Sequence, residues 1–252
     1  MTAPSGRAGG VPGPPRHPTG QLRVMSYNVK DFTADPAAAA RVVRALRPDV
    51  LCLQEVPRRL TTEFRLPSFA RACGLYWAGG RLGTGGTAVL TALRVRVHGT
   101  SRRRLTVRFP DRTRGYAAVD VSLPGWFPIT VVSVHLSLGA QERQRHAGAI
   151  LSRLPERAVV AGDLNEGTDG LAHRSLAGRL VLASGTQPTF PAHDPRSPLD
   201  FIFASADLPT VPASEQDLAN LDVEDLAAAS DHRPVWIDVA ATRPRSSPPT
   251  IE

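Results

Sequence analysis

The chain has 252 residues, 42% of them hydrophobic, which is enough apolar surface for a sizeable core and excludes disorder along the whole chain. Its formal net charge of +7 favours a polyanionic partner such as nucleic acid, an anionic lipid surface or a phosphorylated small molecule. The two cysteines, Cys52 and Cys73, are too few for a disulfide framework.

The two ends of the chain differ in composition from its middle. Residues 1–20 are rich in Pro and Gly and contain no apolar stretch. We predict that this segment and residues 243–252 are disordered, and that residues 21–242 form one domain. No apolar run is long enough for a secretory signal or a membrane span. We therefore expect a cytoplasmic protein without integral membrane contact, with a monomer as the default state.

Short apolar runs with the character of strands recur along the chain. They are rich in Val and Ile, and several alternate with the two-residue period of a half-buried strand. In chain order the predicted strands are Leu22–Tyr27, Val50–Gln54, Thr87–Thr91, Tyr116–Leu123, Ile129–Leu136, Ala158–Gly162, Phe201–Ala204 and Pro234–Ala240.

Three segments between these strands have helical features. An Asp-Pro pair typical of an N-cap and a first helical turn predicts a helix over Ala37–Leu46. Gln141–Leu154 carries apolar residues at helical spacing, with arginines on its other side. Arg58–Cys73 is a third candidate, in which Pro67 is expected to end or kink the helix. Several strands follow one another without a helix between them, which favours mixed or antiparallel sheets with helices outside.

Polar residues of a few types recur at the ends of the predicted strands. A single Asp or Asn at a strand end is more often a turn or cap residue than a functional one. Six such strand ends in one chain are harder to assign to turns, because strands that share a sheet edge bring their ends together. The residues at these ends are Asn28, Glu55, His135, Asp163, Asn165, Asp200, Asp231 and His232.

This collection suits the hydrolysis of a phosphate ester. Carboxylate oxygens with an Asn carbonyl favour a hard cation, Mg²⁺ or Mn²⁺, over zinc held by Cys and His. Such a cation neutralises the charge of the ester and stabilises the leaving oxygen. Amide and imidazole donors can hold the phosphoryl oxygens as charge builds up in the transition state.

Six short motifs and one Gly-rich strand, Gly85–Leu90, occur in order between about residues 22 and 240. The motifs are Ser26-Tyr27-Asn28-Val29, Leu53-Gln54-Glu55-Val56, Ser133-Val134-His135-Leu136, Ala161-Gly162-Asp163-Leu164-Asn165, Leu199-Asp200-Phe201-Ile202-Phe203 and Ser230-Asp231-His232-Arg233-Pro234-Val235. Through them the chain resembles the endonuclease/exonuclease/phosphatase superfamily, which includes DNase I, exonuclease III, neutral sphingomyelinases and inositol polyphosphate 5-phosphatases. The resemblance implies an α+β fold: the four-layer αββα sandwich of DNase I, with two mixed, mostly antiparallel sheets flanked by helices.

The resemblance also implies a role for each strand-end residue. Glu55 would be the main metal ligand, with Asn28 beside it and Asp231 completing or supporting the metal shell. His232 would be an acid/base group oriented by Asp200, and an imidazole beside a carboxylate is indeed held in one tautomer. The remaining three would act on the water and the phosphoryl oxygens: Asp163 would orient or deprotonate the attacking water, and Asn165 and His135 would bind phosphoryl oxygens. Whether Asp163 or His232 is the base stays open at this point.

The arginines bear on the substrate. Every basic residue except Lys30 is arginine. Because this bias runs through the whole sequence, the positive net charge is weaker evidence for a polyanionic partner. The run Arg102–Arg104, with Arg108, Arg112 and Arg114 after it, could follow a phosphate backbone. A solvated strand face and loop explains the run equally well.

The first hypothesis is a Mg²⁺-dependent phosphodiesterase acting on nucleic acid. The second is a phosphatase or phosphodiesterase for a small phosphorylated molecule or a phospholipid head group, and the third is a phosphate-recognition module without catalysis. A continuous stripe of arginines leading to the site would favour a polymer, whereas an isolated pocket would favour a small ligand.

Overall fold

The computed structural model describes residues 20–57, 62–78, 85–108, 113–214, 217 and 219–240. Of the two ends predicted to be disordered, residues 1–19 and 243–252 lie outside the described residues, as do the last two residues of the predicted domain. All eight predicted strands are present, with ends shifted by no more than two residues.

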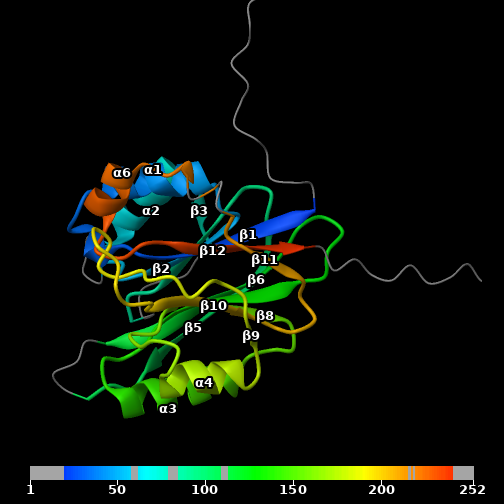
Figure 1. Cartoon of the computed structure of the whole chain (residues 1–252). Coiled ribbons are helices and arrows are strands. Elements are labelled where there is room, and N and C mark those ends of the chain that lie inside the picture. The colour runs from blue at the N-terminus through cyan, green and yellow to red at the C-terminus, as the bar shows by residue number, and fades with distance from the viewer. Residues whose placement is uncertain are drawn as a thin grey trace, which may run out of the picture.

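Two six-stranded sheets pack face to face (Figure 1). The first has the order β11-β12-β1-β2-β4-β3 and the second β5-β6-β7-β8-β10-β9. Only β1/β2 and β7/β8 are parallel pairs among the described strands. The first sheet consists of β1 (Gln21–Asn28), β2 (Val50–Gln54), β3 (Tyr76–Trp77), β4 (Ala88–Thr91), β11 (Thr210–Pro212) and β12 (Val235–Ala240). The second consists of β5 (Arg96–Leu105), β6 (Arg114–Ser122), β7 (Ile129–His135), β8 (Ala158–Asp163), β9 (Val181–Leu182) and β10 (Asp200–Ala204).

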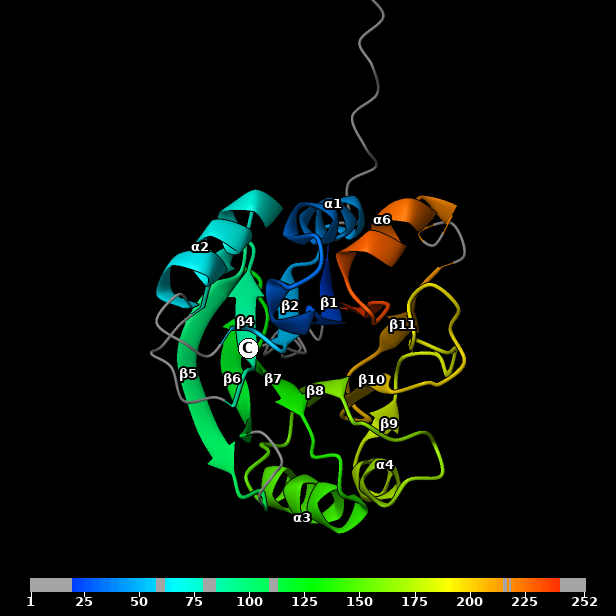
Figure 2. The same ribbon diagram turned by 90° about the vertical axis from the view of Figure 1, so that its left-hand side faces the viewer.

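Helices cover the outer face of each sheet (Figures 1 and 2). The first sheet carries α1 (Pro36–Leu46), α2 (Thr62–Cys73) and α6 (Val223–Ala229), and a short 3-10 helix, η1 (Lys30–Phe32), follows β1. The second sheet carries α3 (Ala140–Leu151) and α4 (Leu171–Ala177). The predicted four-layer αββα sandwich is therefore confirmed.

Alternation along the strands divides the apolar side chains between the layers. In β1, Leu22 and Val24 pack into the core between the two sheets, whereas Met25 and Tyr27 pack under the helices of the first sheet. All four are fully buried, and a buried side chain of this size contributes about 1.5–3 kcal/mol to folding. The central strands therefore have no solvent-facing side, and polar residues are left to their ends.

Two of the three predicted helices follow the sequence pattern closely. The carboxylate of Asp35 accepts hydrogen bonds from the backbone N–H groups of Ala37 and Ala38 at 2.8 and 3.1 Å, which caps α1 as predicted. The α3 helix begins one residue before the predicted start and ends at Leu151 instead of Leu154.

Pro67 was predicted to end or kink the third helix, but the helix does not end there. The α2 helix continues through Pro67 to Cys73, with no break recorded among its described residues. Proline removes one helical hydrogen bond. The buried face after it, formed by Phe69, Ala70 and Cys73, packs into the core cluster and outweighs that loss.

Close contact of β7 and β8 depends on Gly162. A Cβ atom at this position would lie 2.0 Å from the carbonyl oxygen of Val134. Real Cβ atoms do not approach a backbone oxygen so closely, so only glycine lets the two strands pair here. This pairing places His135 beside Asp163 at the ends of the two strands.

We predict that Gly162→Ala lowers the free energy of unfolding by about 1–3 kcal/mol, the usual cost of overpacking. Denaturant unfolding measures it. Gly148→Ala in α3 is the matched control, because its Cβ would meet nothing within 4 Å and alanine favours the helix. A Gly162→Ala protein as stable as the unmutated one would contradict the close contact.

Candidate active site

Three strand-end residues lie side by side in the second sheet. The register pairs His135 on β7 with Asp163 on β8, and Asp163 with Asp200 on β10. All three are buried, so their charges and dipoles interact with little screening by water. The neighbouring strands β7, β8 and β10 thus bring one imidazole and two carboxylates together at the same end of the second sheet.

The first sheet adds Asn28 to this group. Its Nδ2 donates to Asp163 Oδ2 at 3.0 Å, a buried hydrogen bond between the two sheets. The other carboxylate oxygen of Asp163 accepts the backbone N–H of Asn165 at 2.8 Å. Asn165 has a positive φ of 53°, and its amide donates to the carbonyl of Leu136 at 3.0 Å, so the loop is fixed on both sides.

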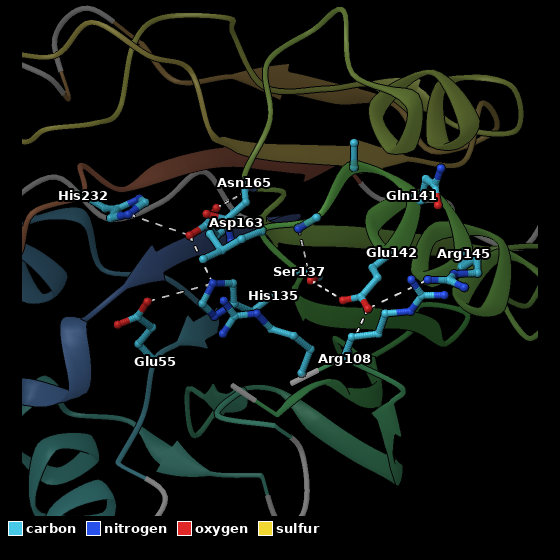
Figure 3. A pocket seen from close by; sticks show the side chains of 14 residues that line it. Glu55, Arg108, His135, Ser137, Gln141, Glu142, Arg145, Asp163, Asn165 and His232 are labelled. Carbon is cyan, nitrogen blue, oxygen red and sulfur yellow. Dashed lines mark hydrogen bonds and ion pairs between the residues drawn. The ribbon is translucent and has the colours of Figure 1, made fainter. Parts of the chain in front are cut away.

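His232 reaches the same carboxylates from the loop before β12. Its Nδ1 lies 2.8 Å from Asp200 Oδ2, and its Nε2 lies 3.8 Å from Asp163 Oδ2. The hydrogen bond to Asp200 fixes the ring, leaving Nε2 directed toward Asp163 (Figure 3).

Thr189 is a site residue that sequence reasoning did not assign. Its hydroxyl donates to Asp200 Oδ2 at 2.6 Å, the same oxygen that His232 contacts. The neighbouring Phe190 ring lies 5.0 Å from the His232 ring, centroid to centroid. A Thr-Phe pair carries no chemical signature of its own, so the sequence alone does not mark it as part of the site.

The environment of the site raises the pKa values of Asp163 and His232 above their usual values. Burial raises the pKa of Asp163, and the nearby charge of Asp200 adds to it, giving about 7. Burial lowers the pKa of His232, but the negative charges of Asp200, Asp163 and Asp231 outweigh it and raise the value to about 10. At neutral pH the imidazole is therefore charged, while the Asp163 carboxyl exchanges its proton easily.

Four of the predicted site residues, His135, Asp163, Asn165 and His232, line a cleft of about 940 Å³ (Figure 3). Glu55, which follows β2 with a positive φ of 51°, keeps 30% of its side chain exposed to the cleft. Its Oε1 lies 4.0 Å from His135 Nε2, which in turn lies 3.5 Å from Asp163 Oδ2. The rest of the lining includes basic and polar residues from α3, from β6 and from the segments after β5 and β7: Arg108, Arg114, Ser137, Gln141, Glu142 and Arg145.

Asp231, predicted to complete or support the metal shell, is linked to it through Lys30. Its Oδ2 forms an ion pair with Lys30 Nζ at 3.1 Å. The backbone N–H of Lys30 donates to Asn28 Oδ1 at 3.1 Å, so Asp231 is linked to Asn28 through Lys30. Among the described residues, no direct contact of Asp231 with Glu55 or Asn28 is recorded.

Two groups of residues have the chemistry to hold a divalent cation. Glu55 offers a carboxylate open to the cleft, and Asn28 offers an amide oxygen close to the same edge, which fits a hard ion. A buried group consists of Asp163, Asp200 and His232, whose potential ligand atoms lie within 4.8 Å of one another. In that group Asp200 Oδ2 is already occupied by His232 and Thr189, so it fits proton transfer better than metal binding.

Comparison with known proteins places this site in a family. Residues 25–232 match the family model described as "Endonuclease/Exonuclease/phosphatase family". The chain belongs to this family. Its members are generally phosphoesterase hydrolases that depend on a divalent metal ion. A search of curated protein sequences found no significant match.

Solved structures with the same fold come from distant relatives. An endonuclease/exonuclease/phosphatase from Bacteroides vulgatus superposes with a TM-score of 0.69 at 16% identity, covering 88% of this chain and 99% of the other. The mannosyl-6-phosphatase of Bacteroides thetaiotaomicron gives 0.66 at 16% identity, covering 87% and 99%. The human Nocturnin catalytic domain, solved with a sulfate anion, gives 0.61 at 18% identity, covering 88% and 94%. At these identities the likeness establishes the shared fold.

Among the described residues, no helix is both long enough and apolar enough to cross a bilayer.

We predict that Asp200→Asn lowers the pKa of His232 by about 1–3 units from its raised value near 10, because a neighbouring negative charge is removed and the charged imidazole is less stabilised. Titration of the histidine ring resonances by NMR measures this shift. Asp194→Asn, at an exposed carboxylate of the loop before β10, is the control and leaves the His232 titration unchanged. If His232 has the same pKa in the Asp200→Asn protein as in the unmutated chain, the electrostatic role of Asp200 is contradicted.

Proposed function

We propose that this protein is a divalent-metal-dependent phosphodiesterase that acts on nucleic acid. The observation that supports it best is the convergence on one oxygen, Asp163 Oδ2, of Asn28, His135 and His232 at 3.0, 3.5 and 3.8 Å. The same cleft contains three arginines suited to phosphate oxygens, Arg108, Arg114 and Arg145. Acid/base groups and anion-binding groups therefore share one solvent-accessible space.

We assign the metal site to Glu55 with Asn28, and the ion to Mg²⁺ or Mn²⁺. When bound, the ion neutralises phosphate charge and stabilises the leaving oxygen. Asp231 supports this site from outside the shell, since its ion pair with Lys30 braces the loop that carries the hydrogen bond to Asn28 Oδ1.

The remaining residues of the site handle the proton and the phosphoryl group. Asp163 takes the proton from the attacking water, because a pKa near 7 leaves much of it ionised at neutral pH while still basic. His232, charged at neutral pH and held by Asp200, stabilises the developing negative charge and gives its proton to the leaving oxygen. His135 and Asn165, which both line the cleft, hold phosphoryl oxygens.

A phosphatase for a small phosphorylated molecule is the second candidate. The cleft volume of about 940 Å³ lies within the range of small-molecule sites, roughly 300–1,000 Å³. The structurally similar mannosyl-6-phosphatase acts, by its name, on such a substrate. Rates on a phosphate monoester and on a diester distinguish this candidate from the first.

We predict nicking of supercoiled plasmid in the presence of Mg²⁺ and none in EDTA. His232→Ala lowers turnover by about 10²–10⁴-fold, the usual value of acid/base help. Glu55→Gln raises the Mg²⁺ concentration needed for half-maximal rate by at least about 10–100-fold, the cost of losing even an indirect metal partner. Gel quantification of nicked plasmid measures each effect.

The exposed residues Glu156 and His193 provide matched controls, as Glu156→Gln and His193→Ala. Both control proteins should nick plasmid at the rate of the unmutated chain. Full activity of both the Glu55→Gln and the His232→Ala proteins would contradict the assignment of these two residues to the active site. Intact plasmid together with rapid hydrolysis of a phosphate monoester would favour the small-molecule phosphatase.

A further inference from the structure

A row of exposed arginines continues from the active-site cleft along β5 and α3. Arg108 and Arg145 line both the cleft and a second hollow of about 350 Å³. That hollow also contains Arg103, Arg104 and Arg153. A third hollow, of about 370 Å³, shares Arg103 and Arg153 with the second and adds Arg102. The three spaces are therefore neighbours that share arginines, and together they are here called the arginine groove.

The arginine groove is strongly positive. Six arginines line its two outer hollows, and Glu142 is the only acidic residue among their described lining residues. The carboxylate of Glu142 accepts from Ser137 Oγ at 2.7 Å and from the backbone N–H of Arg108 at 2.8 Å, so it braces the wall of the cleft. A potential of one sign along a groove attracts a polyanion.

Several arginines elsewhere in the molecule form ion pairs with carboxylates. Examples are Arg23 with Asp238, Arg41 with Asp225, Arg94 with Asp49 and Arg143 with Glu166. Within the groove, Arg145 lies 3.9 Å from a carboxylate oxygen of Glu142. Within the part of the chain that the structure describes, Arg103, Arg104 and Arg153 have no carboxylate partner. The groove thus keeps guanidinium groups available for an external anion.

Protection of a sheet edge explains only part of this arrangement. The β5 strand lies at the edge of the second sheet (Figure 2), and charged residues on an edge strand prevent edge-to-edge aggregation. That accounts for the arginines on β5. It does not account for Arg145 on α3 or for Arg153 just after this helix, which line the second hollow together with Arg103 and Arg104.

We propose that the arginine groove binds the phosphodiester backbone of a single nucleic-acid strand and leads it into the cleft; this rests on the proposed phosphodiesterase activity. Guanidinium groups spaced along a groove match successive phosphates. The one aromatic residue among the described lining residues, Tyr116, is buried, so no base-stacking platform is offered. Binding is therefore independent of base sequence and strongly dependent on salt.

Fluorescence anisotropy with a labelled single-stranded DNA oligonucleotide in EDTA tests the groove without cleavage. The test variant is Arg103→Gln/Arg104→Gln/Arg153→Gln, whose positions lie outside the cleft lining. The control is Arg71→Gln/Arg96→Gln/Arg174→Gln, three exposed arginines that line none of the three spaces. Both variants remove the same charge, so net charge alone cannot separate them.

We expect the groove variant to bind the oligonucleotide at least about tenfold more weakly than the unmutated chain. The slope of log K against log salt should become less steep by about 2, because each of the three lost phosphate contacts to a single strand contributes about 0.7. The control variant binds like the unmutated chain. Equal weakening in both variants, or no binding of DNA beside strong binding of anionic vesicles, would overturn the proposal.

Hydrolysis of bis-p-nitrophenyl phosphate by the unmutated chain with Mg²⁺ reports on the proposed function separately. This ester is too small to extend along the groove. Hydrolysis without any effect of the groove variant on DNA binding would refute the groove alone. The expected loss of DNA binding without hydrolysis of any ester would support the groove and refute the phosphodiesterase.

Discussion

The site depends on one buried carboxylate at the boundary between the two sheets. Asp163 ends β8 and accepts a hydrogen bond from Asn28 of the first sheet at 3.0 Å. Close behind it, the Gln54 amide donates to Ser133 Oγ at 3.2 Å, and that hydroxyl donates to the carbonyl of Leu53 at 2.9 Å. Buried polar groups cost free energy unless they are paired, so these bonds fix how the sheets stack as well as where the charges lie. Stability and chemistry therefore share the same contacts.

Much of the fold was predictable because the buried strands leave a clear record in sequence. The run Val50–Gln54 is apolar up to Gln54, and the run Ala158–Gly162 has no polar side chain, since both faces of the central strands are covered. The charged residue after each run marks the end of a buried strand, where side chains can reach the cleft. For this reason Glu55 and Asp163 could be identified from the sequence. The β5 strand was missed because its residues are mostly exposed and polar, and nothing in their pattern separates an edge strand from a loop.

The remainder of the site depends on contacts between segments far apart in sequence. Thr189 contacts Asp200 through a loop whose path no local pattern specifies. Asp231 was expected to complete or support the metal shell, and its ion pair with Lys30 could not be predicted, because the turn after β1 brings that lysine toward it. Arg145 and Arg153 were visible only as the polar face of a helix, and their place opposite β5 follows from how α3 packs on the sheet. Sequence thus indicated the chemistry of the cleft, and the packing of helices and loops defines its extent.

The most direct test of this account is the turnover of the Asp163→Asn protein on bis-p-nitrophenyl phosphate at saturating Mg²⁺. The substitution keeps the shape of the side chain and an acceptor oxygen for Asn28, but removes the base. The account predicts a folded protein, judged by circular dichroism and thermal unfolding, whose kcat falls by about 10²–10⁴-fold. A folded Asp163→Asn protein that retains the kcat of the unmutated chain would contradict the assignment of Asp163 as the group on which the site converges.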